Sequence, residues 1–252
     1  MKSTARIVKS IIKTIGKNQR RPFVSAIILA GGKSERMGGV SKQLLTVSGT
    51  PVVALSALAF EKCPDVSEIV LVCRDDEKET VEKLMNEYGI GKFKCAVTGG
   101  KTRFDSMKSG FDHVFTDADY VAVHDAARCL ITPEQISSVI ASAMKKGAAI
   151  AASKTTDTIK LTDKNGMIES TVDRSAAWNA QTPQVFKKAM LEVGIYVDRD
   201  EGFSPTDDAM LVETLGFKVG VVDCGYENIK LTTPKDIAVA ESIIEKRRNE
   251  NG

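Results

Sequence analysis

The sequence predicts an α/β fold: a mainly parallel twisted sheet with helices on both faces and a projecting β-hairpin arm. Between residues 23 and 152, short β-branched runs alternate with longer amphipathic stretches, a rhythm typical of parallel sheets covered by helices. An Asn165-Gly166 pair separates two further β-prone runs, which indicates a hairpin. The length of 252 residues suits one large domain, with or without an appendage.

The expected strands are short and apolar. Phe23–Ala30 is rich in β-branched residues and runs directly into glycines, as a buried strand does where it ends. The full set covers residues 23–30, 68–73, 94–97, 120–124, 148–152 and 217–222.

The expected helices occupy the intervals between these strands. In one of them Thr132 can cap the first turn and Pro133 fits the first helical position. The helices cover residues 50–63, 77–88, 102–114, a segment that begins at 132–134, 187–196, 206–215 and the C-terminal stretch from Pro234.

The βα rhythm breaks at about residues 153–176. The two β-prone runs on either side of the Asn-Gly turn are too polar to be buried on both faces. We therefore expect this hairpin to project from the domain, either as an arm that meets a second subunit or as a solvated flap.

Residues 1–22 form a separate N-terminal extension, and residues 23–252 form the main domain. The extension carries seven basic and no acidic side chains, and its apolar residues recur at helical spacing. It is either a loosely docked tail or a basic amphipathic helix that lies on an anionic membrane surface or covers a partner. It lacks the apolar stretch and cleavage site of a secretory signal.

Composition excludes several classes of function. Beyond residue 22 there are 28 basic and 33 acidic residues, a net charge of −5, so the main domain is not a nucleic-acid binder by bulk electrostatics. No apolar run approaches the roughly 20 residues of a transmembrane helix. The five cysteines form no CxxC pair, and there are only two histidines. This pattern favours free thiols in a reducing cytoplasm over disulfides or a zinc site.

A glycine turn follows the first strand and precedes two cations. Gly31 and Gly32 are adjacent, and Arg36 and Lys42 lie six residues apart. Exposed N–H groups in such a turn can bind an anion, and the two cations can neutralise a triphosphate. The spacing matches neither the Walker loop nor the dinucleotide fingerprint. Taken alone, the segment is equally compatible with an ordinary strand-to-helix connection.

Asp125 is the candidate metal ligand. It ends an apolar strand at the edge where open α/β sheets bind ligands, and Mg²⁺ favours one or two carboxylates together with substrate phosphates. The alternative is a helix cap or turn former. The preceding His124 is expected to be a hydrogen-bonded structural residue rather than a general base.

Together these segments resemble a known family. Leu29–Met37 with Lys42 resembles the signature loop of sugar-nucleotide transferases, which have a Rossmann-like fold, and later motifs narrow the resemblance to the 2-C-methyl-D-erythritol 4-phosphate cytidylyltransferases. The resemblance covers residues 24 to about 245. The later motifs are Gly99-Gly100 with Arg103 and Ser106, His124–Arg128, Asp157–Lys160, Thr171–Arg174, Gln181–Gln184, Thr206–Asp208 and Asn228–Lys230.

The resemblance implies transfer of CMP from CTP to methylerythritol phosphate, with release of pyrophosphate, in the synthesis of isoprenoid precursors. It also implies Mg²⁺ and a homodimer in which the arm carries Thr158 and Arg174 into the neighbouring active site. The implied catalytic residues are Arg36, Lys42 and Lys230. Those implied for the nucleotide are Ala30, Gly31, Gly32, Gly100, Lys101, Ser106 and Ala126, and those for the acceptor substrate are Thr158, Arg174, Thr182, Arg128 and Thr206.

Two rival interpretations remain at this point. A ribitol-5-phosphate cytidylyltransferase would share the fold and the CTP loop, and a non-catalytic sugar-nucleotide sensor would share the fold alone. The arm motifs favour the methylerythritol enzymes, and the retained cations and Asp125 disfavour the sensor. Ser41 and Cys129 depart from residues common in the family, but neither departure removes a functional group.

Overall fold

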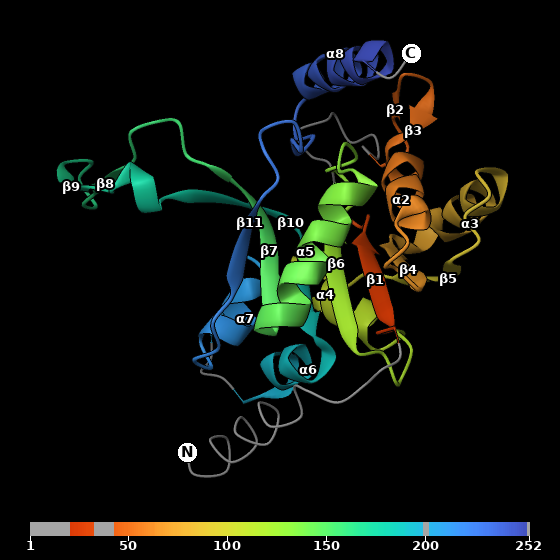
Figure 1. Ribbon diagram of the computed structural model, residues 1–252, viewed down its shortest axis with the longest axis horizontal. Helices are drawn as coiled ribbons and strands as arrows, with labels where there is room; N and C mark the ends of the chain where they lie inside the picture. Colours follow the sequence, from red (N-terminus) through yellow and green to blue (C-terminus); the bar gives the residue numbers. More distant parts are fainter. Residues whose placement is uncertain (1–20, 33–42, 199–201, 251–252) are drawn as a thin grey trace.

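The computed structural model describes residues 21–32, 43–198 and 202–250. Within these ranges, seven strands form one sheet in the order β11-β7-β10-β6-β1-β4-β5 (Figure 1). The strands are β1 (Val24–Leu29), β4 (Glu68–Cys73), β5 (Phe93–Thr98), β6 (Tyr120–Asp125), β7 (Ala148–Lys154), β10 (Trp178–Lys187) and β11 (Gly220–Asp223).

The sheet is mainly parallel, as the sequence predicts. β1 pairs in parallel with β4 and β6, and β4–β5 and β7–β11 are parallel too. The exception is β10, which runs antiparallel between β6 and β7. The sequence pattern did not predict this strand. Pro183 lies within it, and its register with β7 shifts between Ala180 and Gln184, the kind of irregularity at which proline is tolerated in a sheet.

Helices cover both faces of the sheet, and each face has its own core. One face is covered by α2 (Val52–Lys62), α3 (Lys78–Glu87) and α5 (Pro133–Lys146), and the other by α4 (Arg103–Phe111), α6 (Lys188–Tyr196) and α7 (Ala209–Glu213). Ile28 packs with residues of the first group of helices and Ile27 with residues of the second, because successive side chains of a strand point to opposite faces.

A third, smaller cluster attaches the C-terminal helix. α8 (Pro234–Glu250) packs near the two short strands β2 (Thr46–Val47) and β3 (Thr50–Pro51). The cluster contains Val52, Leu231 and Cys129. Since Leu231 follows Lys230 directly, this packing fixes the chain next to a predicted catalytic residue.

The hairpin arm projects from the body of the molecule (Figure 1). It consists of β8 (Lys160–Thr162) and β9 (Ile168–Thr171), followed by the short 3-10 helix η3 (Arg174–Ala176). Gly166 has φ +82° at the turn, a conformation that glycine adopts without strain. Three apolar side chains of the arm stay more than half exposed: Leu161 at 52%, Met167 at 68% and Ile168 at 63%.

The root of the arm is held by β10. Its first residue, Trp178, pairs in register with Lys154 at the end of β7, and the Lys154 ammonium lies 5.7 Å from the centre of the indole ring. Trp178 is half-buried and is the single tryptophan of the chain.

The other predicted elements agree with the structure to within a few residues. The predicted helix over 50–63 begins at Val52, because Thr50 and Pro51 belong to β3, and the predicted strand over 217–222 begins at Gly220. All five cysteines are unpaired. Among the described residues, no helix is long and apolar enough to cross a membrane. Residues 1–20 of the predicted extension lie outside the described ranges.

Gly110 sets the distance between α4 and the sheet. A Cβ atom there would lie 2.5 Å from Ile27 Cγ2 and 2.8 Å from Val72 Cγ2, and both belong to rigid β-branched side chains of the core. We predict that Gly110→Ala lowers the free energy of unfolding by about 1–3 kcal/mol through overpacking, measured by denaturant unfolding. Gly91→Ala is the matched control, because its Cβ would meet only Glu61 Oε1 at 3.6 Å. Equal stability of the two variants would contradict the packing argument.

Candidate active site

The larger of two adjoining cavities lined by described residues, which we call the main cavity, lies at the carboxyl ends of the central strands. Its volume is about 710 Å³, within the usual range for a small-molecule site. β1 and β6 run side by side and place Leu29 opposite Asp125, so the residues that follow each strand meet at one edge of the sheet. The lining residues are Leu29, Gly31, Gly32, Gln43, Gly100, Lys101, Thr102, Arg103, Ser106, Asp125, Ala127 and Lys230.

Four charged side chains form a continuous chain at this cavity. Lys230 Nζ lies 2.6 Å from Asp125 Oδ2, and Arg103 Nη2 lies 3.1 Å from Asp125 Oδ1. The two Nη atoms of Arg103 also donate to the two oxygens of Asp208, each at 2.8 Å. Positive and negative groups therefore alternate in the order Lys230, Asp125, Arg103 and Asp208.

These charged contacts determine the ionisation of the two carboxylates, Asp125 and Asp208. Burial disfavours the charged form of Asp125, but Arg103 and Lys230 outweigh burial and hold the pKa of Asp125 well below its usual value. Burial raises the pKa of Asp208. Both Asp208 oxygens nevertheless accept hydrogen bonds from Arg103, which is the arrangement of an ionised carboxylate.

Asp125 is held from behind by β10. The backbone N–H of Asp125 donates to Thr182 Oγ1 at 3.0 Å, and the same hydroxyl lies 3.1 Å from His124 Nδ1. His124 is fully buried, and burial lowers its pKa to about 3, so the imidazole is neutral at neutral pH. His124 is not among the residues that line the cavity. Thr182, predicted to bind substrate, positions the Asp125 backbone in this structure.

Lys230 is placed by a separate set of hydrogen bonds. Arg128 Nη1 donates to the carbonyl of Asn228 at 2.8 Å, and Asn228 Nδ2 donates to Gln181 Oε1 at 2.9 Å. The backbone N–H of Leu231 donates to the Ala127 carbonyl at 2.8 Å. Arg128, another predicted substrate residue, therefore fastens the segment that carries Lys230.

A second glycine turn, at Gly100, also lines the cavity. Ser106 Oγ accepts from the N–H of Gly100 at 3.1 Å and donates to the Thr102 carbonyl at 2.9 Å. A Cβ on Gly100 would lie 2.3 Å from Asp105 Cβ, so a side chain at this position would collide with the start of α4. Thr102 and Asp105 form a capping box there, which fixes the orientation of the turn.

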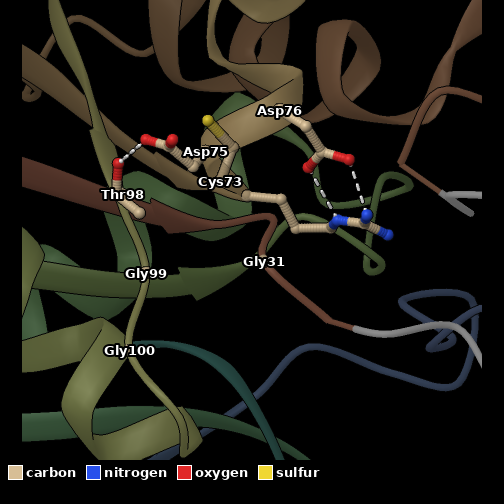
Figure 2. A pocket seen from close by; sticks show the side chains of 8 residues that line it. Gly31, Cys73, Asp75, Asp76, Thr98, Gly99 and Gly100 are labelled. Carbon is tan, nitrogen blue, oxygen red and sulfur yellow. Dashed lines mark hydrogen bonds and ion pairs between the residues drawn. The ribbon is translucent and has the colours of Figure 1, made fainter.

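A smaller cavity of about 570 Å³ adjoins the first (Figure 2). Gly31 and Gly100 line both cavities, so the two spaces meet at the glycine turns. On the far wall Thr98 Oγ1 donates to Asp75 Oδ1 at 2.8 Å. Arg74 binds both oxygens of Asp76, at 2.9 and 2.6 Å.

The structure brings some of the predicted site residues together and separates others. Gly31, Gly32, Gly100, Lys101, Ser106, Asp125 and Lys230 line the main cavity. Ala30 and Ala126 are buried members of the core. Thr206 is exposed before α7. Arg36 and Lys42 lie outside the described residues.

The arm residues stand apart from the cavity of their own chain. Thr158 and Arg174 are exposed, and Arg174 Nη1 donates to the Thr156 carbonyl at 3.2 Å. Neither residue lines the main cavity. Within one subunit, the two predicted acceptor-binding residues of the arm are therefore separated from the cavity.

Sequence reasoning missed three residues that the structure places at the site. Gln43 lines the cavity with a 3% exposed side chain, and its amide oxygen has no partner among the described residues. Arg103 and Asp208 both occur inside motifs that the resemblance rests on, but their mutual contact spans 105 residues. Arg103 and Asp208 could have been proposed as site residues because each is a charged residue within a motif shared with the family.

The ion pairs of Asp125 predict a specific response to acid. Because the folded-state pKa is depressed, Asp125 stabilises the fold above its unfolded pKa near 3.8, and the contribution is lost as the pH falls through the folded pKa. Lys230→Met removes one of the two cations, so acid unfolding should begin at a higher pH than in wild type, as followed by circular dichroism. Lys83→Met, which breaks an exposed pair with Glu79, is the control. Equal shifts in the two variants would refute this account.

Comparison with known proteins matches residues 24–246 to the family described as 2-C-methyl-D-erythritol 4-phosphate cytidylyltransferase (IspD). A protein of that name from Shouchella clausii is 41% identical over 227 residues, 90% of this chain and 98% of its own length. Another, from Endomicrobium trichonymphae, is 42% identical over 221 residues, covering 87% of this chain and 98% of its own.

The fold agrees with solved structures. The crystal structure of 4-diphosphocytidyl-2C-methyl-D-erythritol synthase from Anaerococcus prevotii superposes with a TM-score of 0.81 at 30% identity, over 89% of this chain and 96% of that one. The family match extends over both glycine turns, Asp125, the arm and Lys230. The chain therefore belongs to the 2-C-methyl-D-erythritol 4-phosphate cytidylyltransferase family, and so to the nucleotidyltransferases.

Proposed function

We propose that this chain transfers CMP from CTP to 2-C-methyl-D-erythritol 4-phosphate, giving 4-diphosphocytidyl-2-C-methyl-D-erythritol and pyrophosphate. The observation that carries the proposal is the meeting of Lys230, Asp125 and both glycine turns around one cavity, inside a chain that matches the family from residue 24 to residue 246.

The reaction is a substitution at phosphorus. An oxygen of the 4-phosphate forms a bond to the α-phosphorus of CTP, and the bond from that phosphorus to the bridging oxygen of the β-phosphate breaks. The electron pair of the broken bond leaves with pyrophosphate. The attacking phosphate is already anionic at neutral pH, so the step needs no general base, in keeping with the neutral, buried His124.

Catalysis then depends on position and on charge neutralisation. Lys230 is 39% exposed at its side chain and lines the cavity, so its ammonium is available to phosphate oxygens. Arg36 and Lys42 follow the strand β1, whose last residue Leu29 also lines the cavity. We assign these three cations to the crowded negative charge around the α-phosphorus.

The nucleoside end of CTP belongs at the Gly100 turn. Gly100, Lys101 and Ser106 line the main cavity, and Gly31 and Gly100 open into the second one. Because glycine carries no side chain, a flat base or a ribose can approach the backbone of Gly100 closely.

Asp125 is the residue that would hold a Mg²⁺ ion. Its carboxylate is ionised and is the type of donor that Mg²⁺ prefers. Each carboxylate oxygen accepts two bonds. Oδ1 faces both Nε and Nη2 of Arg103, whereas Oδ2 contacts Lys230 alone among the described residues and retains a lone pair for a cation. The described residues contain no group of three or more His, Cys, Asp or Glu side chains suited to a metal. A bound cation would add positive charge beside the phosphates.

We further propose that the arm completes the active site of a second subunit. Its exposed Leu161, Met167 and Ile168 supply an apolar surface of the kind that marks contact sites. Thr158 and Arg174 lie on the same projecting segment, away from the cavity of their own chain. Exchange of arms in a symmetric dimer would bring them to the partner's acceptor substrate.

Several further assignments stay predictions. The five unpaired cysteines support a cytoplasmic location. The basic amphipathic pattern of residues 1–22 is the feature that suggests a membrane-surface role for that segment.

The first test is loss of a cation. Lys42→Met and Lys230→Met should each lower kcat by about 10²–10³-fold, the usual effect of removing a preorganised charge or donor. Pyrophosphate release is measured with CTP and methylerythritol phosphate, and ribitol 5-phosphate serves as the rival acceptor. Near-full turnover in folded variants would refute these roles. Faster turnover with ribitol 5-phosphate would identify that compound as the acceptor instead. Inactivity of the wild type with every acceptor would favour the non-catalytic sensor.

The second test is subunit complementation. Arg174→Ala and Lys230→Met should each be weakly active, because each damages both sites of its own homodimer. A mixture refolded together should regain about a quarter of wild-type activity, since about half of the dimers are mixed and each of these has one intact site. Separately refolded variants, mixed just before the assay, are the control. No recovery in the co-refolded sample would mean that Arg174 acts within its own chain.

A further inference from the structure

Arg103 and Asp208 have no role in the proposed chemistry, yet they make the most extensive charged contact at the site. Arg103 is bound to Asp208 through two hydrogen bonds of 2.8 Å and to Asp125 through Nε at 3.2 Å. Arg103 and Asp125 line the cavity, whereas Asp208 lies behind Arg103 with a side chain that is 2% exposed.

Asp208 is itself fixed to the sheet. Gln184, in β10, accepts hydrogen bonds through Oε1 from the backbone N–H groups of Asp208 and Ala209, at 3.0 and 2.9 Å. Gln184 is in register with Val123 of the neighbouring strand β6, the same strand that ends in Asp125. Asp208 thus connects the Arg103 guanidinium to the framework that carries Asp125.

The two cations on Asp125 differ in the number of carboxylates that hold them. Among the described residues, Lys230 has Asp125 as its one ion-pair partner, and its side chain is 39% exposed. Arg103 is clamped between two carboxylates. A phosphate that enters the cavity competes with Asp125 for the lysine, and a flexible ammonium can turn toward it more readily than a clamped guanidinium.

We propose that Asp208 is a positioning residue: it anchors Arg103, so that Asp125 keeps one fixed cationic partner while Lys230 turns to substrate phosphate. The inference rests on the proposed function, because it assigns Lys230 to the phosphate. Arg103 therefore stays in place, whereas Lys230 is the cation that moves. Asp208 does this without touching the substrate.

The experiment is a kinetic double-mutant cycle, with pyrophosphate release measured at saturating methylerythritol phosphate. Asp208→Asn should lower kcat about 10–100-fold with a much smaller change in the KM for CTP, because the geometry of the charged centre is lost rather than the nucleotide pocket. Arg103→Lys keeps the positive charge but lacks the planar fork that binds both Asp208 oxygens and Asp125 together, and it should lose a similar factor. The double variant should be no slower than the slower single variant, since Asp208 acts through Arg103.

The control is Glu68→Gln, which neutralises another buried carboxylate with a lysine partner. Glu68 contacts Ser25, Phe115 and Lys94 at the opposite end of the sheet, so it should lower stability but leave kcat unchanged. A kcat of folded Asp208→Asn within twofold of wild type would overturn the proposal, as would losses that multiply in the double variant. If Asp208→Asn does not fold, full activity of the Arg103→Lys variant would by itself overturn the proposal. Wild-type inactivity would instead overturn the proposed function, since every factor is a ratio to wild type.

Discussion

The Asp125 carboxylate, buried between two cations, is the interaction on which the site depends. Removing a charge from water is costly unless partners replace the lost hydration. Here Lys230 and Arg103 provide that replacement. Lys230 lies 105 residues from Asp125 in the sequence, and Arg103 lies 22 residues from it. Loss of either partner would leave an under-compensated buried charge, typically a defect of about 3–5 kcal/mol for a fully buried pair and less for a half-exposed lysine.

The antiparallel strand β10 gives this arrangement its support. Thr182 binds the backbone of Asp125, Gln181 binds Asn228 two residues before Lys230, and Gln184 holds the segment that contains Asp208. One strand therefore positions three members of the charged chain. It also leads directly from the arm, because Trp178 begins β10 where the arm returns to the body. The arm and the strand that supports the active site are thus consecutive along the chain.

Local signals predicted most of the fold, and long-range contacts account for what they missed. Hydrophobic runs and caps located the parallel strands and α5, since these depend on nearby residues. β10 escaped because Pro183 interrupts a strand pattern, and its pairing with β6 and β7 compensates for that interruption. At the site, residue types singled out Asp125 and the Gly31-Gly32 turn, and the family resemblance added the Gly100 turn. The pairing of Arg103 with Asp208 depends on how α4 and the segment before α7 pack, which spacing alone does not reveal. Ala30 and Ala126 belong to shared motifs, but the structure buries them in the core.

The single tryptophan also gives the molecule a built-in optical probe. Trp178 stands half-buried where the arm joins the sheet, with the Lys154 ammonium 5.7 Å from its ring. All indole fluorescence of the chain therefore originates at this junction, and a nearby positive charge shifts or quenches such emission. Any event that bends the arm or covers its root changes a signal to which no other residue contributes, with no label attached.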